Sequence, residues 1–92
     1  MTESQTTIRW TDVFAALASE PRLRIVRMLA KGEVQCQEIL TQIELSQPAV
    51  SYHLAKLERA GILVKERQGT RNCYRLEERV RKLIRMITKE DK

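Results

Sequence analysis

The stretch SQPAVSYHLAKLERAGIL, Ser46–Leu63, presents two faces of different chemistry. Apolar residues recur at helical spacing and form one stripe, which comprises Val50, Leu54 and Leu57. The other face is polar and carries Gln47, Ser51, Tyr52, His53, Lys56 and Arg59. Ser46 suits the N-cap of such a helix, Pro48 its first turn and Gly61 its end. The stretch therefore predicts an amphipathic helix whose polar face is available to a partner.

A second amphipathic helix is predicted just before this one, over about residues 35–43. Its apolar residues follow the spacing i, i+3, i+4, i+7 and are Cys36, Ile39, Leu40 and Ile43. Only three residues, Glu44 to Ser46, join the two helices. Two short helices with so short a connection, the second with an exposed polar face, are typical of a helix-turn-helix. We expect this unit over about residues 35–60.

The flanking segments predict two helices before this unit and a hairpin and a helix after it. The expected bounds are about 11–18 for the first helix, 21–32 for the second, 62–76 for the hairpin and 77–89 for the last helix. Residues 1–9 are expected to be flexible. The fold class is mainly α with a small β-hairpin, in the order α-α-α-α-β-β-α. We expect a single winged helix-turn-helix domain over residues 1–92.

Alternation along the second expected strand, RNCYRL, assigns its two faces. Tyr74 and Leu76 are predicted to point inward, so Arg71, Cys73 and Arg75 should point outward. Gly69 supplies the permissive backbone at the hairpin tip.

The charge of the chain favours a polyanionic partner. The net charge is +5 and the isoelectric point about 9.6. A helix in the major groove reads bases through short donors and acceptors, and basic residues on a wing contact the backbone or the minor groove. The residues expected to contact double-stranded DNA are Ser46, Gln47, Ser51, Tyr52, His53, Lys56, Arg67, Thr70 and Arg71. For His53 the alternative is a half-buried ring bonded to a nearby backbone carbonyl.

Several other classes of function lack the residues that they require. The sequence shows no paired carboxylates, no phosphate-binding glycine loop and no Cys–His pair suited to catalysis, so we do not expect an enzyme or a cofactor. A lone His53 has no second ligand near it, so no metal site is expected. No apolar run is long enough to span a membrane and the N-terminus lacks a signal peptide, which predicts a cytoplasmic protein.

Nearly the whole chain, from about Phe14 to Ile87, resembles the ArsR/SmtB family of winged-helix repressors. The segment LSQPAVSYHLAKLERAGIL is the most specific part, followed by EPRLRIVRML and the wing ending in YRL. The resemblance implies a homodimer paired through its first and last helices, bound to a palindromic operator. It also implies that a ligand or thiol oxidation weakens DNA binding. The amphipathic stripes of both terminal helices agree with such a pairing.

The signal stays open at this point. The family's thiolate site resembles ELCVCDL, whereas this chain has EVQCQEI with Cys36 between two glutamines. Cys36 and Cys73 are the possible sensing thiols; Arg71 and Arg75 favour a thiolate at Cys73, whereas Cys36 suits a buried apolar position. A disulfide between the two within one subunit is disfavoured by their expected separation. Soft-metal sensing across a dimer, an unidentified ligand and no ligand at all remain alternatives.

A different function also fits the same residues. The basic face of a winged helix could bind an acidic protein partner instead of DNA. Tight duplex binding at physiological salt distinguishes the two.

Overall fold

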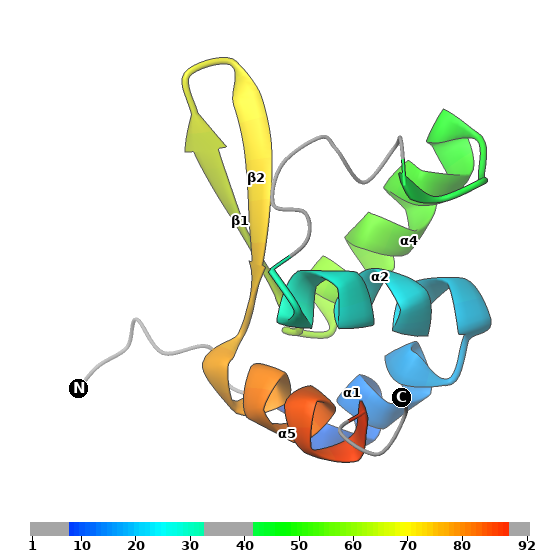
Figure 1. Cartoon of the computed structure of the whole chain (residues 1–92), viewed down its shortest axis with the longest axis vertical. Helices are drawn as coiled ribbons and strands as arrows, with labels where there is room; N and C mark the ends of the chain where they lie inside the picture. The colour runs from blue at the N-terminus through cyan, green and yellow to red at the C-terminus, as the bar shows by residue number, and fades with distance from the viewer. Residues whose placement is uncertain (1–7, 33–41, 89–92) are drawn as a thin grey trace.

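The computed structural model describes residues 8–32 and 42–88. Its elements are α1 (Trp10–Leu17), α2 (Glu20–Ala30), α4 (Gln47–Arg59), β1 (Leu63–Gln68), β2 (Arg71–Leu76) and α5 (Glu78–Thr88). The hairpin projects from a body of helices (Figure 1). These elements confirm the expected winged helix, while the helix expected at 35–43 lies almost entirely outside the described residues.

Aliphatic side chains from every described helix and both strands build one core. Its buried members are Val13, Ile25, Val26, Leu29, Ala30, Ile43, Val50, Leu57, Ile62, Leu63, Leu76, Val80 and Ile84. On α4, Val50 and Leu57 are buried and Leu54 packs against them, as the stripe predicted. Burial of this stripe fixes which side of α4 faces the solvent.

Serine side chains cap two of the helices. The Ser19 hydroxyl accepts a hydrogen bond from the backbone N–H of Arg22 at 3.4 Å, at the start of α2. The Ser46 hydroxyl accepts one from the backbone N–H of Ala49 at 3.2 Å, at the start of α4. Each bond satisfies a donor that the first helical turn leaves without an intrahelical partner. The cap expected at Ser46 is therefore confirmed.

Glu77 performs the same role for α5. Its carboxylate accepts hydrogen bonds from the backbone N–H groups of Arg79, at 2.8 Å, and of Val80, at 3.2 Å. Burial opposes ionisation here, but these bonds and the Arg79 guanidinium outweigh it and lower the pKa of Glu77 from 4.5. The charged cap fixes the point where the wing strand ends and the last helix begins.

A left-handed turn at Gly61 leads from α4 into the wing. Gly61 has φ +83°, and its N–H donates to the carbonyl of Glu58 at 3.0 Å. The next N–H, of Ile62, donates to the carbonyl of Leu57, also at 3.0 Å. This pair of bonds is a Schellman motif, in which the residue after the glycine packs back on the helix. Ile62 and Leu57 are both fully buried, as the motif requires.

The wing is an antiparallel hairpin in regular register. Leu63 pairs with Leu76 at its base and Gln68 with Arg71 at its tip. The N–H of Glu77 donates to the carbonyl of Ile62 at 2.8 Å and closes the base. The base of the hairpin is therefore tied to the end of α4.

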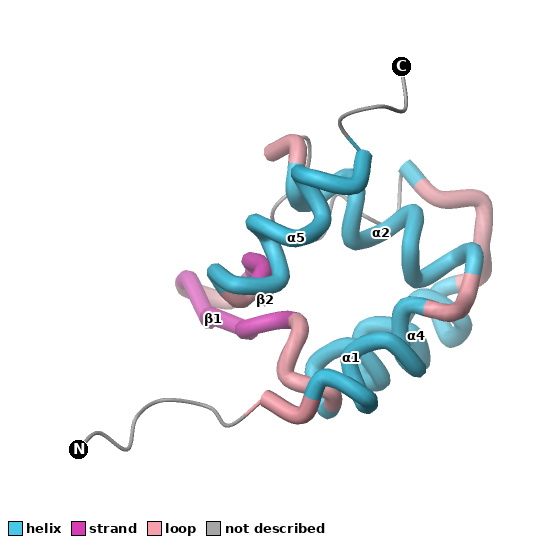
Figure 2. The backbone as a smooth tube through the Cα atoms, turned by 90° about the horizontal axis from the view of Figure 1, so that it is seen from below, coloured by secondary structure: helices cyan, strands magenta, loops and turns pink. Residues whose placement is uncertain are grey.

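The first and last described helices lie on the side of the molecule away from the hairpin tip (Figures 1 and 2). Both expose large apolar side chains. Trp10 and Phe14 of α1 are 39% and 56% exposed, and Met86 and Ile87 of α5 are 69% and 56% exposed. The core of one chain leaves these four side chains uncovered.

We predict that Gly61→Ala lowers the free energy of unfolding by about 1–2 kcal/mol, because a β-carbon is strained at this positive φ. Gly61→Asn should cost less, since asparagine tolerates the left-handed region. Urea denaturation of the three proteins measures the difference. Equal stability of the alanine variant and the unchanged chain would contradict the prediction.

Candidate nucleic-acid interface

The N-terminal half of α4 presents short polar side chains to the solvent. Gln47 and Ser51 are exposed, and Tyr52 is 56% exposed. Tyr52 lies on the helix side opposite the buried Val50 and Leu57, and Gln47 and Ser51 lie nearer the edge of the buried stripe in the first turns. This half of α4 points to the same side of the molecule as the hairpin tip (Figure 1). The polar side chains of this half of α4 are therefore open to the solvent.

The Ser46 hydroxyl has two functions open to it. Its oxygen accepts the capping bond from Ala49, whereas its O–H remains a donor. Ser46 is exposed, so this donor can reach a phosphate while the cap stays in place. The start of α4 also carries the positive end of the helix dipole, which favours a phosphate there.

Tyr52 and Lys56 lie one helical turn apart and contact each other. The Lys56 ammonium nitrogen lies 5.7 Å from the centroid of the Tyr52 ring. Lys56 is half-buried and also lines a groove between α1 and α4, next to Asp12. Lys56 is therefore less exposed than Tyr52 and lies further from the start of α4.

His53 is placed differently from the other polar residues of α4. Its ring is half-buried, and its Nδ1 lies 3.2 Å from the Nη1 atom of Arg22 on α2. Burial and then the positive charge of Arg22 lower the pKa of His53 from 6.5. The sequence offered a half-buried ring bonded to a backbone carbonyl as an alternative. The ring is half-buried, but its partner is the Arg22 side chain.

The wing carries two of its four cations near the tip. Arg67, Thr70 and Arg71 are all exposed. Because Arg67 pairs with Asn72 and Arg71 with Gln68, the two arginines project from opposite faces of the hairpin. Further down, Arg75 is paired with Glu66 at 2.8 Å across the strands. Arg67 and Arg71 therefore flank the end that projects furthest from the body, and Lys65 is exposed nearer the base of β1.

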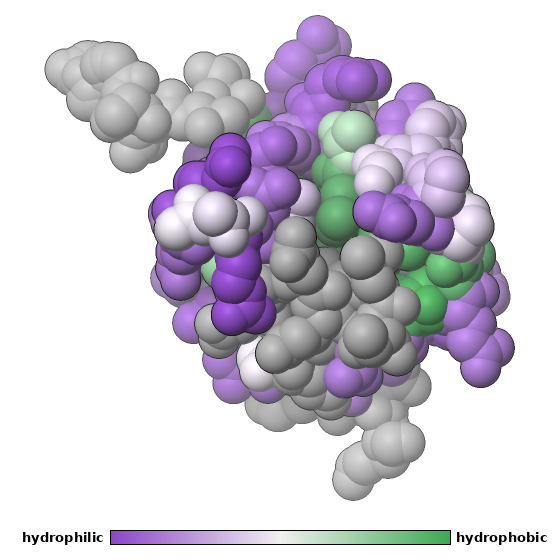
Figure 3. Space-filling model, turned by 90° about the horizontal axis from the view of Figure 1, so that it is seen from above, coloured by the Kyte–Doolittle hydropathy of each residue, from purple (hydrophilic) through white to green (hydrophobic). Residues whose placement is uncertain are grey.

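The space-filling view from above shows the wing and the start of α4 as two hydrophilic ridges on one face (Figure 3). The expected contact residues of α4 other than His53 and Lys56 are exposed, and so are those of the wing. Helix and wing together form the surface that we call the α4–wing face, defined by Ser46, Gln47, Ser51, Tyr52, Lys56, Arg67, Thr70 and Arg71.

Cys73 does not point into the solvent, and the expectation that it does is wrong. Its side chain is 5% exposed, and it is disulfide-bonded. Strand alternation separates two faces correctly, since Tyr74 and Leu76 do pack on the core and Arg71 and Arg75 are exposed. It does not tell whether the second face is covered too. A disulfide brings a second backbone within about 7 Å, so this face is also covered by protein.

The chain has one other cysteine, Cys36, which lies outside the described residues. The pairing that the sequence disfavoured is thus the only one that a single chain permits. The free thiol expected at residue 73 is a second wrong expectation.

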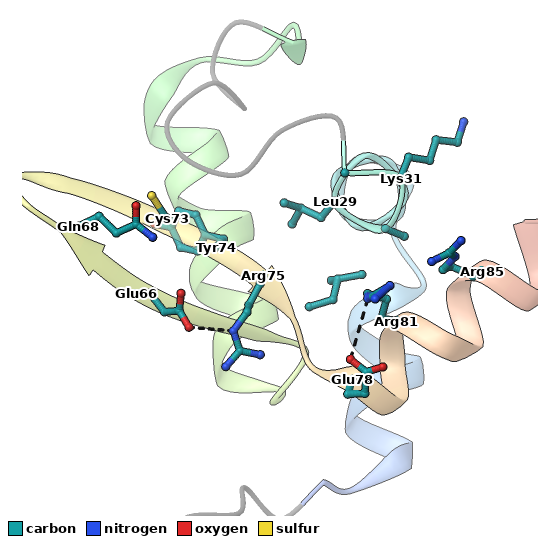
Figure 4. A pocket seen from close by; sticks show the side chains of 13 residues that line it. Leu29, Lys31, Glu66, Gln68, Cys73, Tyr74, Arg75, Glu78, Arg81 and Arg85 are labelled. Carbon is teal, nitrogen blue, oxygen red and sulfur yellow. Dashed lines mark hydrogen bonds and ion pairs between the residues drawn. The ribbon is translucent and has the colours of Figure 1, made fainter.

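A groove of about 820 Å³ opens beside Cys73, between β2, the end of α2 and α5 (Figure 4). It contains four cationic side chains, which are Lys31, Arg75, Arg81 and Arg85. Glu66 pairs with Arg75, and Glu78 lies 4.0 Å from Arg81. The disulfide thus adjoins a groove that connects the wing with the last helix.

Within the described ranges, no three His, Cys, Asp or Glu side chains are grouped so as to hold a metal ion. The segment EVQCQEI, where the family's thiolate site is expected, lies at residues 33–39 and so outside those ranges. None of the helices in residues 8–32 and 42–88 is long and apolar enough to cross a membrane.

One residue that the sequence did not single out contacts the interface. Arg22 follows Pro21 at the start of α2 and reads there as an ordinary surface cation. Its contact with His53 joins residues 31 positions apart. No local pattern in the sequence signals a contact over that separation.

A family model described as "Bacterial regulatory protein, arsR family" matches residues 19–65, about half of the chain. The chain belongs to this family. The match begins at the Ser19 cap and ends in β1, so it includes α4 and the turn that positions it. The arsR-family chain is accordingly a DNA-binding transcriptional regulator, as the helix-turn-helix pattern predicted.

Two curated relatives show how far the similarity extends. An uncharacterized HTH-type transcriptional regulator from Methanocaldococcus jannaschii is 32% identical over 78 residues, covering 83% of this chain and 88% of the relative. The arsenic resistance transcriptional regulator ArsR1 from Pseudomonas putida is 45% identical over 65 residues, covering 70% of this chain and 51% of the relative. The match thus spans about half the length of ArsR1.

Solved structures of arsR-type regulators share the fold. HlyU from Vibrio cholerae matches with a TM-score of 0.79 at 32% identity, covering 87% of this chain and 88% of that chain. A homodimeric winged helix-turn-helix DNA-binding domain, Mb0332 from Mycobacterium bovis, matches with a TM-score of 0.78 at 31% identity, covering 86% of this chain and 74% of that one. The winged helix-turn-helix fold predicted from the sequence is confirmed.

Proposed function

We propose that the chain is a homodimeric repressor that binds a palindromic operator through the α4–wing face of each subunit. The observation that carries the proposal is the shared direction of two features. The polar half of α4 and the basic tip of the wing project to one side of the molecule. A duplex lying along that side meets a helix in its major groove and a wing on the adjacent backbone or minor groove.

The residues of the α4–wing face have different roles in this proposal. Gln47 and Ser51 read base edges, because they are short, exposed and placed in the half of α4 that is clear of the body. Ser46 and Lys56 hold the phosphates on either side of that half. Arg67, Thr70 and Arg71 contact the backbone or minor groove beyond it. Tyr52 supplies a ring for a thymine methyl or a phosphate.

The proposed dimer uses the two helices that face away from the DNA. Trp10 and Phe14, with ring centroids 6.0 Å apart, are exposed on α1, and Met86 and Ile87 are exposed on α5. Exposed apolar surface of this kind marks an interaction site, and a small domain gains core by pairing. The M. bovis relative is described as homodimeric. Two-fold pairing presents two copies of α4, which fits a palindrome.

The proposed domain organisation follows from this arrangement. Residues 1–92 act as one winged-helix unit, in which the terminal helices expected at 11–18 and 77–89 dimerise. Repression follows if the dimer occupies a promoter and blocks its use. One relative is named an arsenical resistance operon repressor, from Escherichia coli, whereas HlyU is named a transcriptional activator. Repression therefore stays the proposal and activation the alternative.

The proposed signal is the redox state of Cys73. Cys73 lies in β2, two residues from Arg71 at the wing tip, and it is disulfide-bonded. Reduction supplies two electrons and two protons, breaks the S–S bond and leaves two thiols. That change uncouples one face of β2 from the protein that covers it and so alters the wing. One HlyU structure from V. cholerae is described as the reduced form, which supports a thiol signal in this family.

Duplexes selected from a random pool at 150 mM salt test the interface. We predict that Gln47→Ala and Ser51→Ala each weaken binding to the selected duplex by about 1–3 kcal/mol and leave binding to random duplex unchanged. Lys56→Ala and Arg71→Ala should weaken both and lower the salt slope by about one each. Arg24→Ala, on the exposed side of α2, is the matched control. If no duplex is selected, the basic face serves an acidic partner instead.

Sedimentation velocity tests the dimer. Phe14→Arg and Ile87→Arg each place a charge in the apolar surface and should convert the dimer to a monomer. Tyr52→Arg is the control, because Tyr52 is as exposed as Phe14 but lies on the α4–wing face. A monomeric unchanged chain, or a dimer in all three variants, would contradict the pairing.

Binding to the selected duplex, measured for oxidised and dithiothreitol-reduced protein, tests the signal. We predict tighter binding by the reduced protein, because thiol oxidation is the releasing signal. Cys73→Ser should bind as the reduced protein does under both conditions, since it cannot form the bond. Equal affinity of both forms of the unchanged chain would exclude a thiol signal at Cys73.

A further inference from the structure

A short chain of hydrogen bonds links the DNA-reading helix to two other helices. The Nη1 atom of Arg22 on α2 lies 3.2 Å from the Nδ1 atom of His53 on α4. The Nε atom of the same guanidinium donates to the backbone carbonyl of Ala16 at 2.7 Å, in the last turn of α1. Arg22 therefore holds α4 and α1 at once, through two separate nitrogens of one rigid group.

The chemistry of the pair fixes the tautomer of the imidazole. Arginine has donors only, so the nitrogen that it contacts must accept. A flipped ring would put a carbon opposite Arg22, and carbon cannot accept. Nδ1 of His53 is therefore unprotonated, and in the neutral ring the proton sits on Nε2. The ring offers a single remaining polar atom, which is a donor.

We propose that Arg22 is a positioning residue for DNA recognition. It keeps His53 neutral, with Nε2–H as the donor for a base or phosphate acceptor, and it locks the orientation of α4 against α1. The inference rests on the proposed function. It adds His53 to the residues that contact DNA. It adds that this contact is set from the body of the protein, by a residue outside the α4–wing face.

The positive charge of Arg22 supports the neutral ring. Its Nη1 atom lies 3.2 Å from Nδ1 of His53, so a proton on Nδ1 would place two cations in contact and remove the acceptor for Arg22. Burial acts in the same direction as the Arg22 charge, so the pKa of His53 lies below 6.5.

The sign of the pH effect follows from that direction. Above pH 6.5 the ring is neutral in both the folded and the unfolded chain, and the Arg22 bond contributes in full. Between 6.5 and the lower pKa of the folded chain, the unfolded state binds the proton first, so stability falls as the pH falls. DNA affinity should fall in the same range through loss of the neutral, positioned ring.

Nitrogen-15 NMR of the imidazole tests the proposal directly, because His53 is the only histidine in the chain. We expect the Nε2–H tautomer at pH 7.5 and a pKa below 6.5. Arg22→Met should mix the tautomers and move the pKa toward 6.5, whereas the matched control Arg24→Met should change neither. A mixed or Nδ1–H tautomer in the unchanged chain, or identical spectra for Arg22→Met, overturns the proposal whether or not the protein binds DNA.

Binding to the selected duplex supplies the second readout. Arg22→Met should raise Kd by about 2- to 10-fold, the range for loss of one hydrogen bond. Arg22→Lys restores the charge but not both contacts and should recover only part of the loss. His53→Asn keeps an acceptor near the Nδ1 position without the Nε2 donor, so it should lose affinity while keeping its stability.

The outcomes separate this proposal from the function on which it rests. If Gln47→Ala weakens binding but Arg22→Met does not, the positioning role is wrong and the α4–wing interface stands. If neither variant changes binding, the interface itself is wrong, and the NMR result still decides whether Arg22 sets the tautomer. If Arg22→Met fails to fold, Arg22→Lys and His53→Asn carry the comparison, and unchanged affinity in both overturns the proposal.

Discussion

The left-handed turn at Gly61 is the constraint that joins α4 to the wing and directs both to one side of the molecule. Its Schellman bonds place Ile62 in the core directly above Leu57, so the first residue beyond the helix is already anchored. The bond from Glu77 to Ile62 then fixes the other strand at the same point. Helix and hairpin are thereby joined at a common base. Their other ends project to the same side of the molecule. Ile62 is bonded to both, through Leu57 of α4 and through Glu77 after β2.

The side of the molecule away from the hairpin tip exposes large apolar side chains. The core is aliphatic, and it includes residues of α4 and of the base of the hairpin. Nothing in the core covers Phe14 or Ile87, although Val13 and Ile84 beside them are fully buried. A chain of this size buries only about 60–65% of its unfolded surface. The proposed pairing through α1 and α5 would complete the burial without covering the α4–wing face.

Local rules accounted for most of the fold. The caps at Ser46 and Gly61, the stripe containing Val50 and Leu57, and the hairpin are each set by residues within one or two turns of each other, so periodicity and turn chemistry suffice. The expectations failed where distant segments meet. Cys73 was assigned to an open face because alternation cannot show that a second layer covers it. Arg22 was missed because its partner His53 lies 31 residues away.

The two contacts that the sequence did not reveal act on the two halves of the proposed interface. Cys73 lies on the strand that carries Arg71, and its opposite neighbours Tyr74 and Leu76 pack on the core. Strand β2 thus has the core on one side and a disulfide on the other, and the proposed redox signal acts on the second. Arg22 acts on α4 in a comparable way, through a bond that a single proton removes. In this proposal, protonation of His53 and reduction of the Cys73 disulfide change DNA recognition through contacts inside the protein, not through contacts with the DNA.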